Sequence, residues 1–351
     1  MLADLEALVK LESPTEDLQS CRDVIALANE IATRVLGTPA EIREVNGRPV
    51  FWWGSTTPDV IVLAHLDTVW PKGSFEPLWQ VEGTTARGPG IFDMKAGFIQ
   101  ALYAMKGISE GAALVATTDE ETGSATTKEF IKEISAKAKA VLVLEATLDG
   151  KVKTGRKGTA MYQVKIHGKA SHAGLEPEKG INATIEMARI VSELVKLEKP
   201  ELGTSVVPTV LKSGTTTNTV PALATLEVDS RSFSMAEMER VKSAIYSLEP
   251  THPDARIEVV GGINRPPLEE SVTKSLYEKL ELVAKRLEIG KIGSAIVGGA
   301  SDGNFAGIHT QVLDGLGAVG SGAHALTENI SINDLEPRTK LLSALVKELL
   351  I

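Results

Sequence analysis

Three apolar runs constrain the fold of this chain most, because each ends in residues that can bind a metal or move a proton. None of the runs shows polar alternation, which predicts strands that are buried on both faces. Helical patterns at 94–105 and 124–135 separate them, so we expect an α/β fold with a mixed, mostly parallel sheet and flanking helices. The runs are Val60–Ala64 followed by His65 and Asp67, Ala112–Thr118 followed by Glu120 and Glu121, and Ala140–Leu144 followed by Glu145.

A second type of pattern interrupts this α/β arrangement after about residue 155. Segment 159–168 alternates apolar and polar residues, which predicts a strand with one exposed face. The order of elements that follows is β-α-β-β-α-β, as in ferredoxin-like (split βαβ) domains. We therefore expect an α/β domain at 1–156 and 264–351, interrupted by an inserted α+β domain at 157–263. The elements expected in the insertion are strands at 159–168, 205–211, 222–229 and 255–260 and helices at 180–198 and 235–248.

Composition excludes several kinds of function. The net charge is −9 and no Lys/Arg run stands out, which argues against a nucleic-acid partner. Cys21 is the single cysteine, so neither an intramolecular disulfide nor a thiolate metal site can form. No apolar run is long enough to span a bilayer, and the N-terminus lacks the pattern of a signal peptide. We therefore expect a cytoplasmic protein that binds no membrane.

Metal chemistry is predicted where the apolar strands end. The carboxyl ends of parallel strands meet at one edge of a sheet, and open α/β sheets bind their ligands there. Two glycine-rich segments add Asp93, just before a predicted helix at 94, and His324 near the end of the chain. A cluster of carboxylates is unfavourable unless a cation lies among them. Histidine with several carboxylates suits zinc, cobalt or manganese.

Each of these residues also has a purely structural interpretation. Asp93 is well placed to be the N-cap of the helix at 94. The pair Glu120–Glu121 is typical of a solvated helix start, where acidic side chains interact favourably with the helix dipole. Glu145 and His324 taken singly fit surface positions. The set as a whole favours a metal site more strongly than any of its members.

Taken in order, the motifs resemble the M20 metallopeptidase family of co-catalytic zinc aminoacylases and carboxypeptidases, and its glutamate carboxypeptidase branch in particular. The resemblance covers nearly the whole chain. It rests on HLDTV (65–69), GPGIFDMKAG (88–97), TDEETGS (118–124), Glu145, SHAG (171–174) and His324, with GGASDGNF (298–305) and LDGLGAVG (313–320) in support. No expected ligand is missing.

The resemblance implies a role for individual residues. It makes His65 and Glu145 the ligands of one metal ion and Glu121 and His324 the ligands of the other, with Asp93 bridging the two. Asp67 would orient His65, and Glu120 would be the general base that takes a proton from the shared water. In the insertion, His172 would stabilise the oxyanion; the alternatives are a surface residue at a strand exit for His172 and a turn residue before a strand for Asn218. The implied substrate contacts are Asn218, Arg231, Gly299 and Ser301, with Arg231 gripping a carboxylate; the alternative for Arg231 is a surface salt bridge to Asp229.

The function implied is hydrolysis of an amide bond by two divalent metal ions, zinc above all, with cobalt or manganese as alternatives. The product would be a C-terminal amino acid, with glutamate as one candidate, released from a small peptide or an N-acyl amino acid. A deacylase or desuccinylase of a biosynthetic pathway, similar to acetylornithine deacetylase or succinyl-diaminopimelate desuccinylase, is the enzymatic alternative. A non-catalytic binding homologue is the alternative from another class. The resemblance also implies a homodimer formed through the inserted domain.

Overall fold

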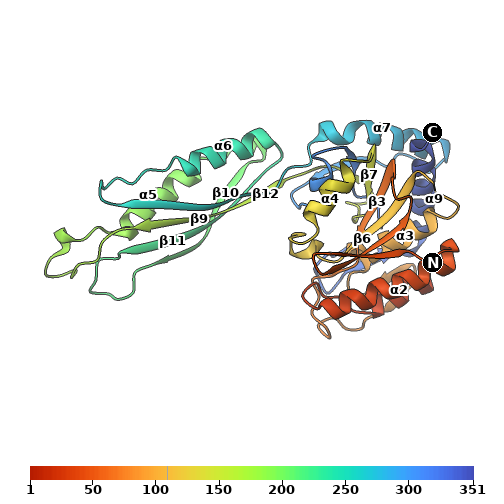
Figure 1. Ribbon diagram of the computed structural model, residues 1–351, viewed down its shortest axis with the longest axis horizontal. Coiled ribbons are helices and arrows are strands. Elements are labelled where there is room, and N and C mark those ends of the chain that lie inside the picture. The colour runs from red at the N-terminus through yellow and green to blue at the C-terminus, as the bar shows by residue number, and fades with distance from the viewer. Residues whose placement is uncertain (109) are drawn as a thin grey trace. The chain divides into compact units, whose positions relative to one another are not determined.

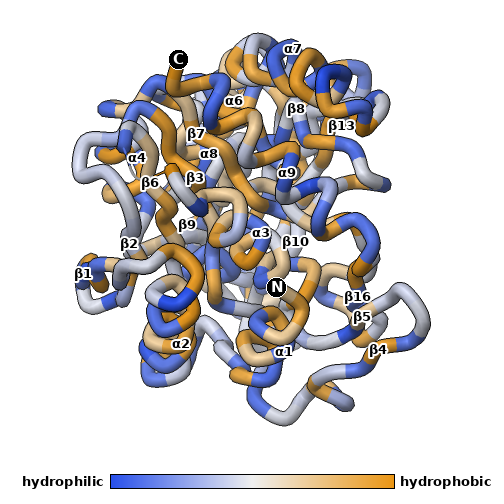
Figure 2. The backbone as a smooth tube through the Cα atoms, turned by 90° about the vertical axis from the view of Figure 1, so that its right-hand side faces the viewer, coloured by the Kyte–Doolittle hydropathy of each residue, from blue (hydrophilic) through white to orange (hydrophobic). Residues whose placement is uncertain are grey.

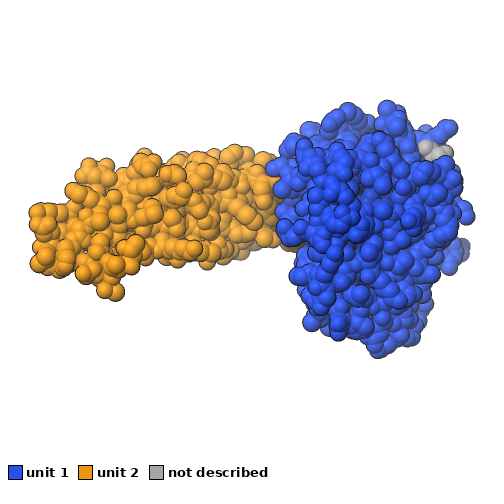
Figure 3. Space-filling view, turned by 60° about the horizontal axis from the view of Figure 1, so that its bottom comes forward, with its two compact units in different colours: residues 1–155, 268–297, 301–351 blue, residues 156–267, 298–300 orange. Residues whose placement is uncertain are grey.

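The computed structural model describes residues 1–108 and 110–351, which divide into two compact units (Figures 1 and 3). One unit comprises residues 1–155, 268–297 and 301–351. The other comprises residues 156–267 and 298–300. The insertion predicted from the sequence was 157–263. In the described part of the chain, no helix is long and apolar enough to cross a membrane.

The larger unit is built on a six-stranded mixed sheet. Strands β6, β3, β7 and β14 pair in parallel, whereas β1 and β2 form an antiparallel hairpin that joins β6 at the edge. The predicted α/β class with a mostly parallel sheet is therefore confirmed. In order across the sheet, the strands are β1 (Glu41–Val45), β2 (Arg48–Gly54), β6 (Ala112–Thr117), β3 (Val60–His65), β7 (Ala140–Val143) and β14 (Gln311–Leu313).

Both faces of this sheet are covered because alternate residues of each strand point to opposite sides. Val60, Val62 and Ala64 of β3 belong to a core formed with α1, α2, α3, α7 and α9, while Ile61 and Leu63 pack toward α4 and α8. Figure 2 shows hydrophobic colour along the central strands and mixed colour along α2 and α7. The helices are α1 (Leu2–Lys10), α2 (Leu18–Leu36), α3 (Ala96–Ala104), α4 (Lys128–Ser135), α7 (Glu270–Arg286), α8 (Gly303–Ala306) and α9 (Ile332–Leu349).

Two smaller sheets complete the larger unit. Strands β15 (Gly320–Ser321), β16 (Asn329–Ser331), β5 (Thr85–Arg87) and β4 (Gln80–Glu82) form an antiparallel sheet. Strand β8 (Val152–Arg156) pairs with β13 (Ser294–Val297). The antiparallel sheet brings residues near the C-terminus next to the chain around residue 87.

The smaller unit has the β-α-β-β-α-β order that the sequence predicted. Its antiparallel sheet runs β10-β11-β9-β12, and its core joins the inner face of that sheet to the two helices. This strand order is that of a ferredoxin-like domain. The elements are β9 (Gly158–His167), α5 (Ala183–Val195), β10 (Ser205–Ser213), β11 (Leu223–Ser232), α6 (Met235–Tyr246) and β12 (Arg256–Arg265).

Two helix starts differ from the prediction. Thr15 follows Ser13 and Pro14, and from sequence this pattern predicts a helix at about 16–35 with Thr15 as its cap. In the structure α2 is capped by Asp17, whose side chain accepts a hydrogen bond from the backbone N–H of Ser20. Helix α3 begins at Ala96 and not at residue 94, because Asp93 and Met94 have non-helical backbone angles. Asp93 therefore does not cap this helix, and its side chain remains available for another role.

Candidate metal centre and active site

The strand ends meet as the apolar runs predicted. Parallel register pairs His65 at the end of β3 with Thr117 at the end of β6, and Leu63 with Val143 at the end of β7. Glu120 and Glu121 follow β6 in a single 3-10 turn, and Glu145 lies two residues beyond β7. Three separate segments thus deliver their acidic or imidazole side chains to one edge of the sheet.

Asp93 joins two groups of potential metal ligands. Its Oδ1 lies 3.3 Å from His65 Nε2, which is itself 3.6 Å from Glu145 Oε1. Its Oδ2 lies 3.4 Å from His324 Nε2, which is 3.1 Å from Glu121 Oε2. In each group the ligand atoms lie within 4.8 Å of one another. One carboxylate therefore presents a different oxygen to each group, as a carboxylate that bridges two metal ions through both oxygens would.

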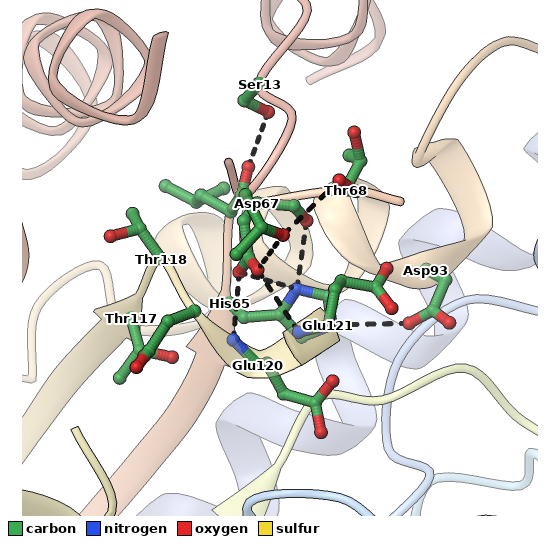
Figure 4. A network of polar contacts seen from close by, with 12 residues as sticks. Ser13, His65, Asp67, Thr68, Asp93, Thr117, Thr118, Glu120 and Glu121 are labelled. Carbon is green, nitrogen blue, oxygen red and sulfur yellow. Dashed lines mark hydrogen bonds and ion pairs between the residues drawn. The ribbon is translucent and has the colours of Figure 1, made fainter. Parts of the chain in front are cut away.

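Asp67 organises the residues around His65 (Figure 4). Its backbone carbonyl lies 3.1 Å from His65 Nδ1, which fixes the ring so that Nε2 faces Asp93. Its carboxylate accepts hydrogen bonds from the Thr15 hydroxyl (2.7 Å) and from the backbone N–H groups of Glu121 (3.2 Å) and Glu120 (3.4 Å). A fully buried aspartate thus ties the end of β3 to the turn after β6.

The two adjacent glutamates point in different directions. In Figure 4 the Glu121 side chain extends toward Asp93, whereas the Glu120 carboxylate extends away from Asp67. Both residues lie in the same short turn. Neighbouring side chains can therefore serve two purposes, one as a ligand and the other facing a substrate.

The turn that carries Asp93 allows no larger residue at Gly90. This glycine has φ +65°, and a Cβ atom there would lie 2.3 Å from Thr68 Cγ2. Left-handed backbone and lack of space both require glycine at this position. The Asp93–Met94 peptide bond that follows is cis.

The donor set suits divalent cations. Burial opposes protonation of His65, but its contacts with Asp67, Asp93 and Glu145 outweigh burial and raise the pKa of His65 well above its usual range. Contacts with Asp93 and Glu121 raise the pKa of His324 to about 10. Without a metal ion, two protonated imidazoles would have to offset the surrounding carboxylates. Oxygen and imidazole donors in this excess of negative charge could hold divalent metal ions.

The carboxylates show the complementary pattern. Burial opposes ionisation of Asp93, yet contacts with His324 and His65 lower the pKa of Asp93. Burial raises the pKa of Glu121 to about 7, aided by the nearby charge of Asp93 and opposed by His324. A bound cation would favour the ionised form of both groups.

His172 and Asn218 belong to the smaller unit, on adjacent segments. The backbone N–H of Ala173 donates to the Asn218 carbonyl, and both side chains are exposed. His172 Nδ1 accepts hydrogen bonds from the backbone N–H groups of Gly174 and Leu175, each at 3.1 Å. In the neutral ring this leaves the proton on Nε2, which suits a donor to a developing negative charge.

The other predicted substrate residues differ from one another in exposure and in contacts. Arg231 lies within β11 and makes a two-pronged pair with Asp229, at 3.0 and 3.2 Å. Gly299 is exposed, and its carbonyl accepts from Arg156. Ser301 is 0% exposed, and its hydroxyl donates to Asp314 Oδ2 at 2.6 Å. Because burial leaves no surface for a ligand, Ser301 fits a structural role better than the predicted substrate contact.

Two further charged residues lie near the potential metal ligands and were not predicted from the sequence. Lys153 Nζ lies 3.9 Å from Glu145 Oε2. Glu328, four residues after His324, is 0% exposed and contacts the turn that carries Asp93. Nothing in the local pattern around either residue distinguishes it from an ordinary surface charge.

The chain is similar to known peptidases and amide hydrolases. A family model described as a peptidase dimerisation domain matches residues 154–251. The chain is 31% identical over 310 residues to carboxypeptidase G2 of Pseudomonas sp. (strain RS-16), covering 83% of this chain and 74% of that protein. It is 24% identical over 342 residues to succinyl-diaminopimelate desuccinylase of Pelagibacter ubique (strain HTCC1062), covering 88% of each.

Solved structures share the fold over nearly the whole chain. An aminopeptidase from Bacillus cereus ATCC 10987 superposes with a TM-score of 0.79 at 21% identity, covering 99% of this chain and 97% of that one. A dinuclear metal-binding peptidase of the M20 family from Bacillus subtilis gives a TM-score of 0.69 at 14% identity, with coverage of 99% and 97%. With the sequence relatives, these likenesses show that the chain belongs to the M20 metallopeptidase family and is a hydrolase of peptide or amide bonds.

Proposed function

We propose that this protein is a dinuclear metal hydrolase that releases a C-terminal amino acid from small peptides or N-acyl amino acids. His65 and Glu145 would hold one ion, Glu121 and His324 the other, and Asp93 would bridge them. Zinc is the ion that we expect first, with cobalt and manganese as alternatives, because the donors are nitrogen and oxygen.

One observation carries the proposal: the two oxygens of Asp93 face two different histidines, at 3.3 and 3.4 Å. A carboxylate that only caps a helix or forms a single salt bridge does not require a histidine at each of its two oxygens. The separate carboxylate partners, Glu145 and Glu121, give each group its own third donor.

The residues of the chain divide the work of hydrolysis. Bound metal ions supply Lewis acidity, which polarises the scissile carbonyl and lowers the pKa of water. Glu120 would accept a proton from the attacking water and deliver it to the leaving amine. His172 would donate from Nε2 to the developing oxyanion. Asp67 holds the His65 ring in orientation.

For the substrate, a free carboxylate next to the scissile amide is the expected feature. Arg231 would bind that carboxylate in two-pronged fashion in place of Asp229, with Asn218 and Gly299 as further contacts. The 31% identity to carboxypeptidase G2 favours a carboxypeptidase, with glutamate as a candidate product. The weaker but longer match to a desuccinylase keeps a deacylase as the second candidate.

Metal content and Glu120 test the hydrolytic proposal together. Purified protein should contain two divalent ions per chain by elemental analysis, and removal by a chelator should abolish hydrolysis until metal is restored. Replacing Glu120 with Gln should leave both ions bound and lower kcat by about 10²- to 10⁴-fold, because a general base is lost. A protein that binds no ion, or a Glu120→Gln variant as active as the wild type, would refute the mechanism.

A substrate panel separates the two enzymatic candidates. It should pair dipeptides and N-acyl amino acids that end in glutamate with the same compounds carrying a C-terminal amide, and should include N-succinyl diamino acids. The carboxypeptidase proposal expects turnover only when the C-terminal carboxylate is free. Exclusive turnover of the succinylated diamino acids would replace it with the desuccinylase.

A homodimer formed through the smaller unit is the expected assembly, because that unit matches a peptidase dimerisation domain. Light scattering coupled to size-exclusion chromatography should give twice the chain mass of 37.4 kDa. The cytoplasm is the expected compartment.

A further inference from the structure

Glu328 places a buried carboxylate against the turn that carries Asp93. Its Oε1 accepts from the backbone N–H groups of Phe92 (2.9 Å) and Asp93 (3.0 Å). Its Oε2 accepts from the backbone N–H of Gly90 and from Trp70 Nε1, both at 3.0 Å. Four donors thus converge on one side chain that is 0% exposed.

Such an arrangement fixes the backbone of the turn. A buried charged group is costly unless hydrogen bonds compensate it, so the carboxylate and the N–H groups hold one another in place. Three of the four donors are the backbone N–H groups of Gly90, Phe92 and Asp93. One of them therefore belongs to Asp93 itself. The position of the Asp93 side chain between the two histidines therefore depends on this contact.

The same residue also anchors the loop that carries His324. Strands β15 and β16 pair Gly320 with Ile330 on either side of this loop, and β16 pairs with β5 (Figure 2). Within the loop, the N–H of Glu328 donates to the carbonyl of Ala325 at 2.8 Å. Glu328 therefore lies at the base of the loop whose tip presents His324.

We propose that Glu328 is a positioning residue that sets Asp93 and His324 relative to one another, and so shapes the shared side of the metal centre. The inference rests on the proposed dinuclear function. It differs from a purely structural role, in which loss of Glu328 would lower stability and leave metal binding unchanged.

Replacing Glu328 with Gln tests this with little change in volume. Each carboxylate oxygen of Glu328 now accepts from two N–H donors. The amide nitrogen of glutamine replaces one of these oxygens and cannot accept, so the hydrogen bonds to that oxygen are lost. Metal affinity, measured by competition with a coloured chelator for zinc or cobalt, should fall about ten- to hundredfold, as for other residues that orient ligands. The visible spectrum of the cobalt-loaded variant should also change, because it reports the geometry of the ligands.

Glu186→Gln is the matched control. Glu186 is a buried glutamate in the smaller unit that accepts from the backbone N–H groups of Thr251 (2.9 Å) and His252 (3.1 Å). It should lose thermal stability but keep wild-type metal affinity. Equal losses of metal affinity in both variants would show a general effect of destabilisation and overturn the proposal.

Trp70→Phe is the milder variant should Glu328→Gln fail to fold. It removes one of the four donors and keeps an aromatic ring against Phe75, whose centroid lies 4.9 Å away. A smaller loss of metal affinity in the same direction is expected.

If the wild type binds two ions and both variants bind them equally well with an unchanged cobalt spectrum, the positioning role is wrong and the hydrolytic function stands. If the wild type binds no ion, the proposed function itself fails.

Discussion

Asp67→Asn tests how far the metal centre depends on a residue that is no expected ligand. Asp67 is fully buried, and its carboxylate accepts from Thr15 and from the backbone of Glu120 and Glu121. Asparagine keeps the volume and one acceptor, so the contacts at Oδ2 can survive. The amide nitrogen would then lie at the position of Oδ1, 3.4 Å from His65 Nδ1.

The substitution therefore acts on the tautomer of His65. In the wild type, the Asp67 backbone carbonyl and Oδ1 both face Nδ1 of His65 as acceptors. The variant keeps the carbonyl, but its amide N–H opposes a proton on Nδ1 and so favours the tautomer whose proton sits on Nε2, which faces Asp93 and Glu145. A metal ligand needs a lone pair at that nitrogen. Loss of an orienting partner costs about ten- to hundredfold in metal affinity or activity, equivalent to about 1.4–2.7 kcal/mol.

The assay is a chelator competition titration combined with kcat/KM on a cleaved substrate. Asp4→Asn is the control, because Asp4 is another buried aspartate of the larger unit, with Arg34 and Tyr103 as partners. It should destabilise the protein without weakening metal binding. The reasoning is refuted if Asp67→Asn binds both ions as tightly as the wild type, or if the control loses as much affinity.

Three further changes test other parts of the structure. Gly97→Ala should destabilise the protein by about 1–3 kcal/mol or more in urea unfolding, because overpacking is costly and its Cβ would lie 2.2 Å from the Leu144 carbonyl; an unchanged midpoint would contradict this close packing. His172→Ala should lower kcat by about 10²- to 10³-fold, as for an oxyanion donor. Its melting temperature should not change, because the side chain is exposed. A variant with wild-type kcat would show that His172 takes no part in the mechanism. The hydrogen bond from Arg240 lowers the pKa of Glu237 to about 2 from 4.5, so its stabilisation is complete above pH 4.5 and is lost as the pH falls toward 2; in Glu237→Gln, stability should fall less steeply over that range, and an identical pH profile would contradict the assignment.

Much of the fold was predictable because burial leaves a clear pattern in sequence. The run Val60–Ala64 has no polar residue and forms the central strand β3, which is buried on both faces. The small residues Ala96 and Gly97 in the helical pattern at 94–105 indicate a close approach, and the backbone of Leu144 lies against Gly97. The alternating segment from residue 159 forms β9, whose burial alternates along most of its length.

Local boundaries were harder to predict because competing caps resemble one another in sequence. Thr15 and Asp17 are both suitable caps for α2, and only the fold shows that the Thr15 hydroxyl donates to Asp67. Asp93 before a helical pattern also had the features of an N-cap. Its non-helical backbone depends on the turn between Gly90 and Lys95, and that turn is held by a residue more than two hundred positions away.

By itself, the sequence determined the residue types at the strand ends, the parallel sheet that gathers them and the family to which they point. Those features follow from local periodicity and from the rule that parallel strands end at one edge. Only the tertiary structure decided that each oxygen of Asp93 faces a different histidine, and that Glu328 joins its turn to the His324 loop. Such contacts connect segments far apart in the chain. They depend on packing that local sequence does not encode.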